Sequence, residues 1–342
     1  MIIQSDKLVP NPKVSVVIAT YNQKEFIEET IMSALNQKCD FPFEIVVGDD
    51  GSNDGQRELL KEIQKRYPET IKLLFNDENL WVTKNYVNAI KEANGLYIAT
   101  LDGDDIWINE YKLKMQIEAI ESDSSISLVH TGFVSFESAS GSEIGRNIKW
   151  ESPMKSVSGS NAVVSFLTGK YSYYPLGSSS VFRKDQYLKY IDRFKSLIED
   201  KNSVGEGTLL NVMLALQGRF HYIPECCVKY RVLPSSLSHF SQKNKRIDFA
   251  FNYTKHKLIA ATCATLSIDE KGRILDKCLQ DALIVSLQCH NYKSYSQYIQ
   301  ALRKEFATDV SLKGYISSAT SLTFLMKAII KSVLTKLRKR IL

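Results

Sequence analysis

Three carboxylates occur within four positions of the segment LDGDDIW: Asp102, Asp104 and Asp105, directly after a hydrophobic run. A turn at this point can aim two of them at one place. Ligand sets made only of oxygen favour a hard cation such as Mg²⁺ or Mn²⁺, which keeps several waters and takes phosphate oxygens as its other ligands. A lone Asp-x-Asp is also an ordinary polar turn, so a metal site is predicted only if other polar groups reach the same place.

A second acidic cluster, GDDGSNDG, follows the run FEIVV and contains Asp49 and Asp50. Its carboxylates can accept hydrogen bonds from ribose hydroxyls or from a base N–H. Glycine and aspartate are also common turn formers, which leaves a purely structural turn open. Tyr21, after the run VSVVIAT, can stack on a planar base or be simply half-buried.

The elements that must position these residues follow from the alternation of short β-branched runs with amphipathic stretches, which predicts a parallel sheet built from βαβ units. Ligands of such sheets bind beyond the carboxyl ends of the strands, so we expect the polar clusters to meet at one edge. No GxGxxG or GxxxxGK[ST] loop is present, so a phosphate must be held by a metal or by cationic side chains. The expected strands are VSVVIA, FEIVV, IKLLF and LYIATL, with helices over 24–36, 56–67 and 83–93.

The second half of the sequence is less regular. We expect a strand in SISLVHTGFVSF, a mobile polar connection over 137–159, helices over 160–168 and 206–217, a strand or hairpin in FHYIPECCVKYRV, and only helices over 242–342. Gly218 is the expected cap of the second of these helices.

Charge and composition limit the function classes. Of the 44 basic residues, six lie in 323–342, which has no acidic residue, so the remaining chain carries 38 basic against 38 acidic residues. A neutral body argues against nucleic-acid binding, and the basic, amphipathic tail predicts a helix lying on an anionic membrane, or one packed on the domain or a partner. Residues 1–13 lack the apolar run of a secretory signal, no run is long enough to span a bilayer, and the six cysteines have no metal-type spacing, so we expect a cytosolic chain with reduced cysteines.

Taken together and in order, VSVVIATYNQKEFIEETIMSALNQ, FEIVVGDDGSNDG, NLWVTKN and GLYIATLDGDDIW resemble the nucleotide-sugar-binding half of family 2 glycosyltransferases, and the resemblance extends over about residues 12–235. It implies the α/β fold called GT-A, a Rossmann-like, mainly parallel sheet flanked by helices. The domain implied is 1–240, with a nucleotide-sugar half over 12–125 and an acceptor half over 126–240. A helical region with the basic tail follows over 241–342.

The resemblance also implies the donor-site residues. Thr20 and Tyr21 would border the base, while Asp50, with Asp49 beside it, would bind the base or the ribose. Lys84 stands where the family often has a basic residue near the nucleotide, although an exposed helix lysine is the alternative.

Asp102 and Asp104 match the family's DXD motif, which binds Mn²⁺ or Mg²⁺. Asp104 is the expected direct metal ligand, and Asp102 is expected to contact the ribose or a metal-bound water. Asp105 and Trp107 extend the match, with Trp107 either a core residue or a platform for the sugar.

The family's catalytic base begins a later helix, and here GEGTLL provides the matching segment. Glu206 takes the position of the usual aspartate and Leu209 that of the leucine after it. A glutamate that only favours the helix dipole is the alternative, and Glu199 and Asp200 are rival bases nearby.

The segment KYRVLPSSLSH is similar to a family segment whose arginine and histidine approach the diphosphate or the metal. Arg231 matches the arginine, but Leu233 stands in place of the histidine. His239 is a substitute only if the loop is shifted, so the third protein ligand stays open.

Such a site implies an inverting transfer of sugar from a nucleoside diphosphate sugar to an acceptor hydroxyl. The expected acceptor is a glycan or lipid-linked glycan in bacterial surface polysaccharide assembly, at the cytoplasmic face of the inner membrane. Two alternatives stay open. A sugar nucleotidyltransferase would show a glycine- and arginine-rich loop near the start, which VSVVIATYNQ lacks, and a non-catalytic relative would bind nucleotide sugar or glycan without turnover.

Overall fold

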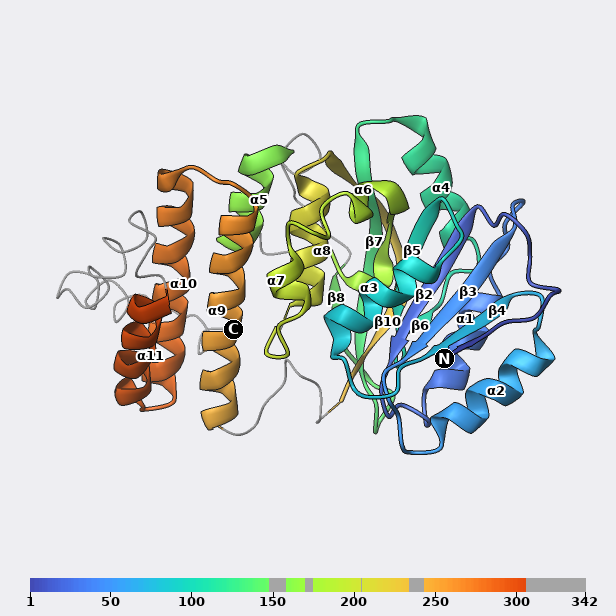
Figure 1. The fold of residues 1–342 in the computed structure, drawn as a ribbon, viewed down its shortest axis with the longest axis horizontal. Helices are drawn as coiled ribbons and strands as arrows, with labels where there is room; N and C mark the ends of the chain where they lie inside the picture. Colours follow the sequence, from blue (N-terminus) through green and yellow to red (C-terminus); the bar gives the residue numbers. More distant parts are fainter. Residues whose placement is uncertain (148–157, 170–174, 204, 234–242, 306–342) are drawn as a thin grey trace.

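A computed structural model describes residues 1–147, 158–169, 175–203, 205–233 and 243–305. Its strands form a single sheet, with the N-terminal strands on the right of Figure 1. The order is β1-β4-β3-β2-β5-β9-β7-β10-β6, and β8 pairs with β7 beside this path. The strands are β1 (Ile2–Ile3), β2 (Val14–Thr20), β3 (Phe43–Asp49), β4 (Ile71–Phe75), β5 (Tyr97–Asp102), β6 (Ile106–Trp107), β7 (Ile126–Glu137), β8 (Glu143–Asn147), β9 (Ser180–Arg183) and β10 (Arg219–Val232).

The four strands β4, β3, β2 and β5 are parallel neighbours, as the βαβ pattern predicts. Their carboxyl ends lie at one edge, where the loops after Thr20, Asp49 and Asp102 emerge. Beyond β5 the sheet becomes mixed, because β9 runs antiparallel to both β5 and β7 while β10 runs parallel to β7. The predicted fold class, an α/β fold with a mainly parallel sheet flanked by helices and a helical C-terminal region, is confirmed.

Helices cover both faces of the sheet (Figure 1). One face packs against α1, α2 and α4, and the other against α3 and the helices from α5 onward. The helices are α1 (Ile27–Leu35), α2 (Gln56–Arg66), α3 (Val82–Glu92), α4 (Lys112–Ser122), α5 (Gly159–Leu167), α6 (Lys184–Leu188), α7 (Lys195–Ile198), α8 (Glu206–Ala215), α9 (Lys243–Cys263), α10 (Ile268–Gln288) and α11 (Tyr292–Glu305), with a 3₁₀ turn η2 (Gly177–Ser179).

The two cores follow from the alternation of side chains along each strand. In β2, Val16 and Ile18 point to the face of α1, while Val17 points to the face of α3. All three are fully buried, which explains why this strand reads as a continuous apolar run.

One element of the second half differs from the sequence prediction. Residues 143–147 were expected in a mobile connection, but they form β8, an antiparallel hairpin partner of β7. The polar, exposed composition of β8 hides it, because it lies beside the path of the sheet and has no apolar face to bury. The segment FHYIPECCVKYRV was expected to form a strand or a hairpin, and it forms one strand, β10, with register shifts near Ile223 and Cys226.

The C-terminal helices α9 to α11 stand at the left of Figure 1, beyond α5, α7 and α8. Leu258 of α9 and Leu275 of α10 belong to the same buried cluster as Val17 of the sheet. The helical region is thus built onto the α/β domain through a shared core, and the boundary near 241 stays a prediction. The tail over 323–342 lies outside the described residues.

The cysteines are free thiols, as expected. Cys227, Cys278 and Cys289 are buried, and the adjacent Cys226 and Cys227 lie in β10. Among the helices of the described ranges, none combines the length and the apolar character that crossing a bilayer requires.

Candidate active site

Asp102 is the last residue of β5, and two neighbours hold its carboxylate. Tyr86 of α3 donates its hydroxyl to Oδ1 at 2.6 Å, and the Ser178 hydroxyl lies 3.2 Å from Oδ2. Burial raises the pKa of Asp102, and these two hydrogen bonds oppose the rise. The carboxylate is therefore oriented by the protein, which suits the expected contact with a ribose or a bound water.

Asp105 turns into the core. Its side chain is fully buried, accepts the Ser178 hydroxyl at 2.5 Å and accepts the backbone N–H of Arg231 at 3.0 Å. Burial raises the pKa of Asp105 well above its usual range. Trp107 is also a core residue, because it is 4% exposed and its indole N–H donates to the Ser178 carbonyl at 2.8 Å. Of the two roles considered for Trp107, the structure therefore supports the core residue.

Asp104 lies between these two residues in the sequence, and its side chain is only half-buried. Burial, and then the charge of Asp102, raises the pKa of Asp104 to about 7, although Arg231 and Gln23 oppose the shift. Gly103 allows this turn to sit against β2, because a Cβ at Gly103 would lie 2.6 Å from the Thr20 side chain. The DXD turn thus holds an acid that ionises only near neutral pH, next to a second carboxylate.

Glu206 begins α8, and its charge interacts with that of Asp102. Burial, and then the charge of Asp102, raises the pKa of Glu206, while the backbone N–H groups of Glu206 and Gly207 lower it. The Glu206 charge also contributes to the raised pKa of Tyr86, the hydrogen-bond partner of Asp102. Residues that are about 100 positions apart in the sequence are thereby brought into one electrostatic site.

The rival acids point elsewhere. Glu199 is exposed and lies 3.8 Å from the Lys195 ammonium. Asp200 accepts the backbone N–H of Asn202 at 2.9 Å and so closes its own turn. Of these three acids, Glu206 is therefore the one whose pKa is raised by the charge of Asp102.

Asp50 lies in a buried hydrogen-bond chain at the end of β3. Its Oδ1 accepts the Asn76 amide at 3.0 Å and the Leu80 backbone N–H at 2.8 Å. Asn76 also donates to Asn85 at 2.9 Å, and Asn85 donates to the Gly48 carbonyl at 2.8 Å. Burial raises the pKa of Asp50, and the Leu80 and Asn76 hydrogen bonds oppose the rise. This chain ties the loop after β3 to the loop before α3.

Asp49 has a structural role in the same turn. Its carboxylate is fully buried and pairs with Arg57 at 2.7 Å and with the Gln56 amide at 2.7 Å. The other end of the Gln56 amide accepts the Gln23 backbone N–H at 2.9 Å and lies 3.0 Å from the Thr20 hydroxyl. Gln56 therefore joins the loops that follow β2 and β3.

Gly51 gives a test of this packing. Its φ is +80°, and a Cβ there would lie 2.8 Å from the Glu78 backbone carbon and 2.9 Å from the Asn79 backbone nitrogen. We expect Gly51→Ala to lower the free energy of unfolding by about 2–4 kcal/mol, because backbone strain and a backbone clash add together. Gly145→Ala is the matched control, since no heavy atom lies within 4 Å of its added Cβ. Equal denaturation midpoints for the two variants would contradict the clash.

The remaining predicted donor residues line the same edge. Thr20 is buried at the end of β2, and Tyr21 follows it with 44% of its surface exposed, which leaves its ring accessible to a base. Lys84 lies half-buried in the first turn of α3. The structure therefore brings Thr20, Tyr21, Asp50 and Lys84 to the carboxyl edge of the sheet, and their contacts with a donor stay predictions.

Arg231 stabilises the DXD turn through a hydrogen bond to its backbone. Its guanidinium lies between the rings of Phe26 and Phe136, 4.5 and 4.7 Å from their centroids. It donates to the Asp104 carbonyl at 2.8 Å and to the Glu29 carboxylate at 2.8 Å. These contacts give Arg231 a role that the sequence did not indicate, and its contact with a diphosphate stays a prediction. Leu233 lies just after β10, and His239 lies outside the described residues.

The donor set at the DXD turn fits a divalent cation of the hard type. Within the described residues, no three acidic, histidine or cysteine side chains converge to hold a metal by themselves. Asp104 and Asp102 offer carboxylate oxygens, and their mutual charge disfavours ionisation of Asp104, a cost that a cation would remove. Mg²⁺ and similar ions are commonly held by one or two carboxylates together with the phosphates of a substrate.

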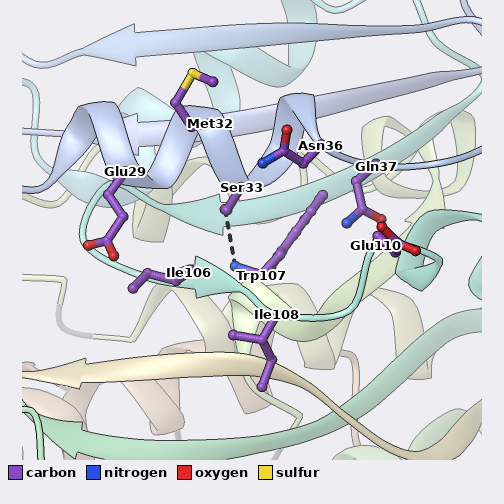
Figure 2. A pocket seen from close by; sticks show the side chains of 9 residues that line it. All are labelled: Glu29, Met32, Ser33, Asn36, Gln37, Ile106, Trp107, Ile108 and Glu110. Atoms are coloured by element: carbon purple, nitrogen blue, oxygen red, sulfur yellow. Dashed lines mark hydrogen bonds between the residues drawn. The ribbon is translucent and has the colours of Figure 1, made fainter.

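A pocket of about 390 Å³ lies beside this site, between α1 and the segment around β6 (Figure 2). Two of its polar side chains already have protein partners, since Ser33 accepts the Trp107 backbone N–H at 3.1 Å and Gln37 donates to the Asn109 carbonyl at 2.8 Å. None of the DXD carboxylates lines it, so we do not assign the donor to this pocket.

Several site residues have no sequence signal. Tyr86 and Ser178 orient Asp102, and Gln56 joins two loops, but each is an ordinary polar residue in a helix or turn. The run GSSS around Ser178 stands out only as a small-residue segment.

Comparison with known proteins agrees with this geometry. Residues 15–182 match the family described as Glycosyl transferase family 2. Over 107 residues, the chain is 36% identical to the putative teichuronic acid biosynthesis glycosyltransferase TuaG of Bacillus subtilis, covering 31% of this chain and 41% of TuaG. Over 126 residues, it is 32% identical to the putative glycosyltransferase EpsE of the same organism, covering 37% of this chain and 45% of EpsE. The chain thus spans less than half the length of either relative.

The fold also matches a solved structure over nearly the whole chain. TarS 1–349 of S. aureus, in complex with UDP-GlcNAc, superposes with a TM-score of 0.60 at 17% identity, covering 96% of this chain and 92% of TarS 1–349. At this identity the likeness shows the fold, which agrees with the GT-A arrangement described above. Residues 15–182 of this chain therefore form a domain of the family 2 glycosyltransferases.

Proposed function

We propose that the protein is an inverting, metal-dependent glycosyltransferase that moves a sugar from a nucleoside diphosphate sugar to an acceptor hydroxyl. The observation that carries the proposal is that Asp104 and Glu206 both interact with the charge of Asp102, which lies at the carboxyl edge of the parallel strands. One acid pair is suited to a cation and a diphosphate, and a third acid with a raised pKa approaches from α8. This is the separation of roles that a single displacement needs.

The residues of this chain divide the work. Tyr21, Asp50 and Lys84 bind and orient the nucleotide, and Asp102, held by Tyr86, positions the ribose side of the donor. Glu206 takes the proton of the attacking acceptor hydroxyl, whose oxygen bonds to the anomeric carbon as the bond from that carbon to the diphosphate oxygen breaks. When bound at Asp104, Mn²⁺ or Mg²⁺ supplies positive charge for the departing diphosphate. Because bond formation and cleavage occur on opposite faces, the anomeric configuration inverts.

The proposal also includes the class of acceptor and the cellular location of the enzyme. The names of TuaG and EpsE support a substrate in surface polysaccharide synthesis, with a glycan or lipid-linked glycan as the acceptor. The six basic residues of 323–342 support a peripheral contact with an anionic membrane, at the cytoplasmic face of the inner membrane. No nucleic-acid partner is proposed, because the charge of the rest of the chain is balanced.

The test is isothermal titration with nucleoside diphosphates and their sugars, with and without Mn²⁺, beginning with UDP-GlcNAc because TarS is seen with it. We expect metal-dependent binding of one nucleotide class to the wild-type protein, and the same binding to Glu110→Gln, whose exposed carboxylate pairs with Lys38 at the surface. Failure of every donor to bind, with or without metal, would remove the donor site. Donor binding without transfer to any acceptor of a glycan panel would favour the non-catalytic alternative.

A further inference from the structure

The segment that carries Glu206 is held from outside its own helix. Glu206 is the first residue of α8, and Gly205, at the N-cap position before it, has no side chain to cap the helix. A capping side chain normally fixes where a helix begins, because it satisfies the backbone N–H groups of the first turn. The position of Glu206 must therefore depend on contacts made by other elements.

Those contacts come from α9. The Tyr253 hydroxyl lies 2.9 Å from the Thr208 hydroxyl in the first turn of α8. The Nδ1 of His256 lies 2.8 Å from the Ser203 hydroxyl, just before α8. The His256 side chain is 2% exposed, so its bond to Ser203 is shielded from water. The two bonds flank Gly205 and Glu206 on either side along the chain.

The two α9 side chains also leave Gly205 no room to move toward them. A Cβ built on Gly205 would lie 3.2 Å from the Tyr253 ring and 3.4 Å from the Nε2 of His256. Both rings therefore pack directly on the backbone one residue before Glu206.

The α9 helix is itself well anchored. The ring of Tyr298 on α11 stacks on Phe251 with centroids 4.2 Å apart and donates its hydroxyl to the Phe251 carbonyl at 3.1 Å. Arg193 donates to the carbonyl of Cys263 at the end of α9, and Leu258 is buried in the shared core. The Tyr253 ring is covered by the Lys257 ammonium, 4.4 Å from its centroid. A rigid α9 can thus transmit a fixed position to the start of α8.

From these contacts we propose that Tyr253 and His256 are positioning residues for the catalytic base, so that the C-terminal helical region sets the place of Glu206. The inference rests on the proposed role of Glu206. A displacement of about 1 Å at a reacting group can cost about 100-fold in rate, so loss of either bond should lower turnover far more than donor binding. These residues lie beyond the matched family segment, which ends at residue 182.

The experiment compares Tyr253→Phe and His256→Leu with Tyr111→Phe. The last variant is the matched control, because it removes a tyrosine hydroxyl from an exposed ring at the start of α4, which takes no part in the contacts of α9 with α8. We expect the first two to lower kcat by about 10- to 100-fold with the donor KM within twofold of wild type. His256→Asn, which keeps a hydrogen-bonding atom near the Nδ1 position, should recover most of the rate.

Hydrogen exchange separates this inference from the proposed function, because it needs no turnover. We expect the first helically bonded N–H groups of α8, beginning with that of Leu209, to exchange at least 10-fold faster in Tyr253→Phe than in Tyr111→Phe, with similar global stability. If the wild-type protein transfers no sugar and exchange is still faster in Tyr253→Phe, the contacts of α9 with the start of α8 are supported. The proposed role of Glu206 as the catalytic base is then wrong. Unchanged exchange together with unchanged kcat in Tyr253→Phe would overturn the inference.

Discussion

Replacement of Glu206 by glutamine is expected to lower kcat by about 10²- to 10⁴-fold while donor binding stays within about twofold, because a general base contributes in the transition state and not to donor affinity. The amide keeps the size and the hydrogen bonds of the side chain but cannot take the proton of the acceptor hydroxyl. The measurement is kcat from the release of nucleoside diphosphate, together with donor affinity by titration. Glu199→Gln is the matched control, since its carboxylate is exposed and pairs with Lys195 at the surface.

The pH profile gives the same prediction a second readout. Burial and the Asp102 charge raise the pKa of Glu206, so its base form is lost at a higher pH than for an ordinary glutamate. The kcat of the wild-type protein should therefore fall as pH drops through that raised pKa, and this limb should disappear in Glu206→Gln. If Glu206→Gln keeps a wild-type kcat while Asp200→Asn loses it, the base is Asp200 and the assignment of α8 is wrong.

The sequence predicts the donor half of this protein well, for a physical reason. Buried parallel strands need apolar β-branched runs, and a polar residue directly after such a run must lie at the carboxyl edge of the sheet. Asp50, Asp102 and Asp104 are found there because strand endings alone determine their positions. Glu206 was placed by resemblance, and its approach to Asp102 depends on a chain path that no local pattern encodes.

What the sequence could not predict are the partners that fix these acids. Tyr86, Ser178 and Gln56 act through contacts between elements distant in sequence, and each reads locally as an ordinary residue of a helix or turn. Arg231 shows the same limit, because its guanidinium holds the Asp104 carbonyl and Glu29 between two rings. Sequence motifs and hydrophobic periodicity specify at which edge of the sheet a residue lies. The hydrogen bonds between side chains depend on how the helices and strands pack together.

Replacement of Asp104 by asparagine is expected to abolish metal-dependent donor binding and at the same time to stabilise the metal-free protein. The folded state raises the pKa of Asp104 from 3.8 to about 7, chiefly by burial and then by the Asp102 charge. A raised carboxyl pKa means that the folded state binds the proton more tightly than the unfolded state, so its ionisation costs stability. That cost grows as pH rises from about 4 to 7 and is fully present above pH 7.

The free energy of unfolding of metal-free Asp104→Asn should therefore exceed that of wild type by about 1–3 kcal/mol at pH 8 and match it near pH 4, measured by urea denaturation in chelator. Mn²⁺ at about 100 times its Kd should stabilise wild type by about 2.7 kcal/mol and leave the variant unchanged. Because protons compete with the cation for Asp104, this gain should shrink as pH falls below about 7. Equal stabilisation of Asp104→Asn and wild type by Mn²⁺ would move the metal away from the DXD turn, since an amide beside Asp102 cannot replace the lost charge.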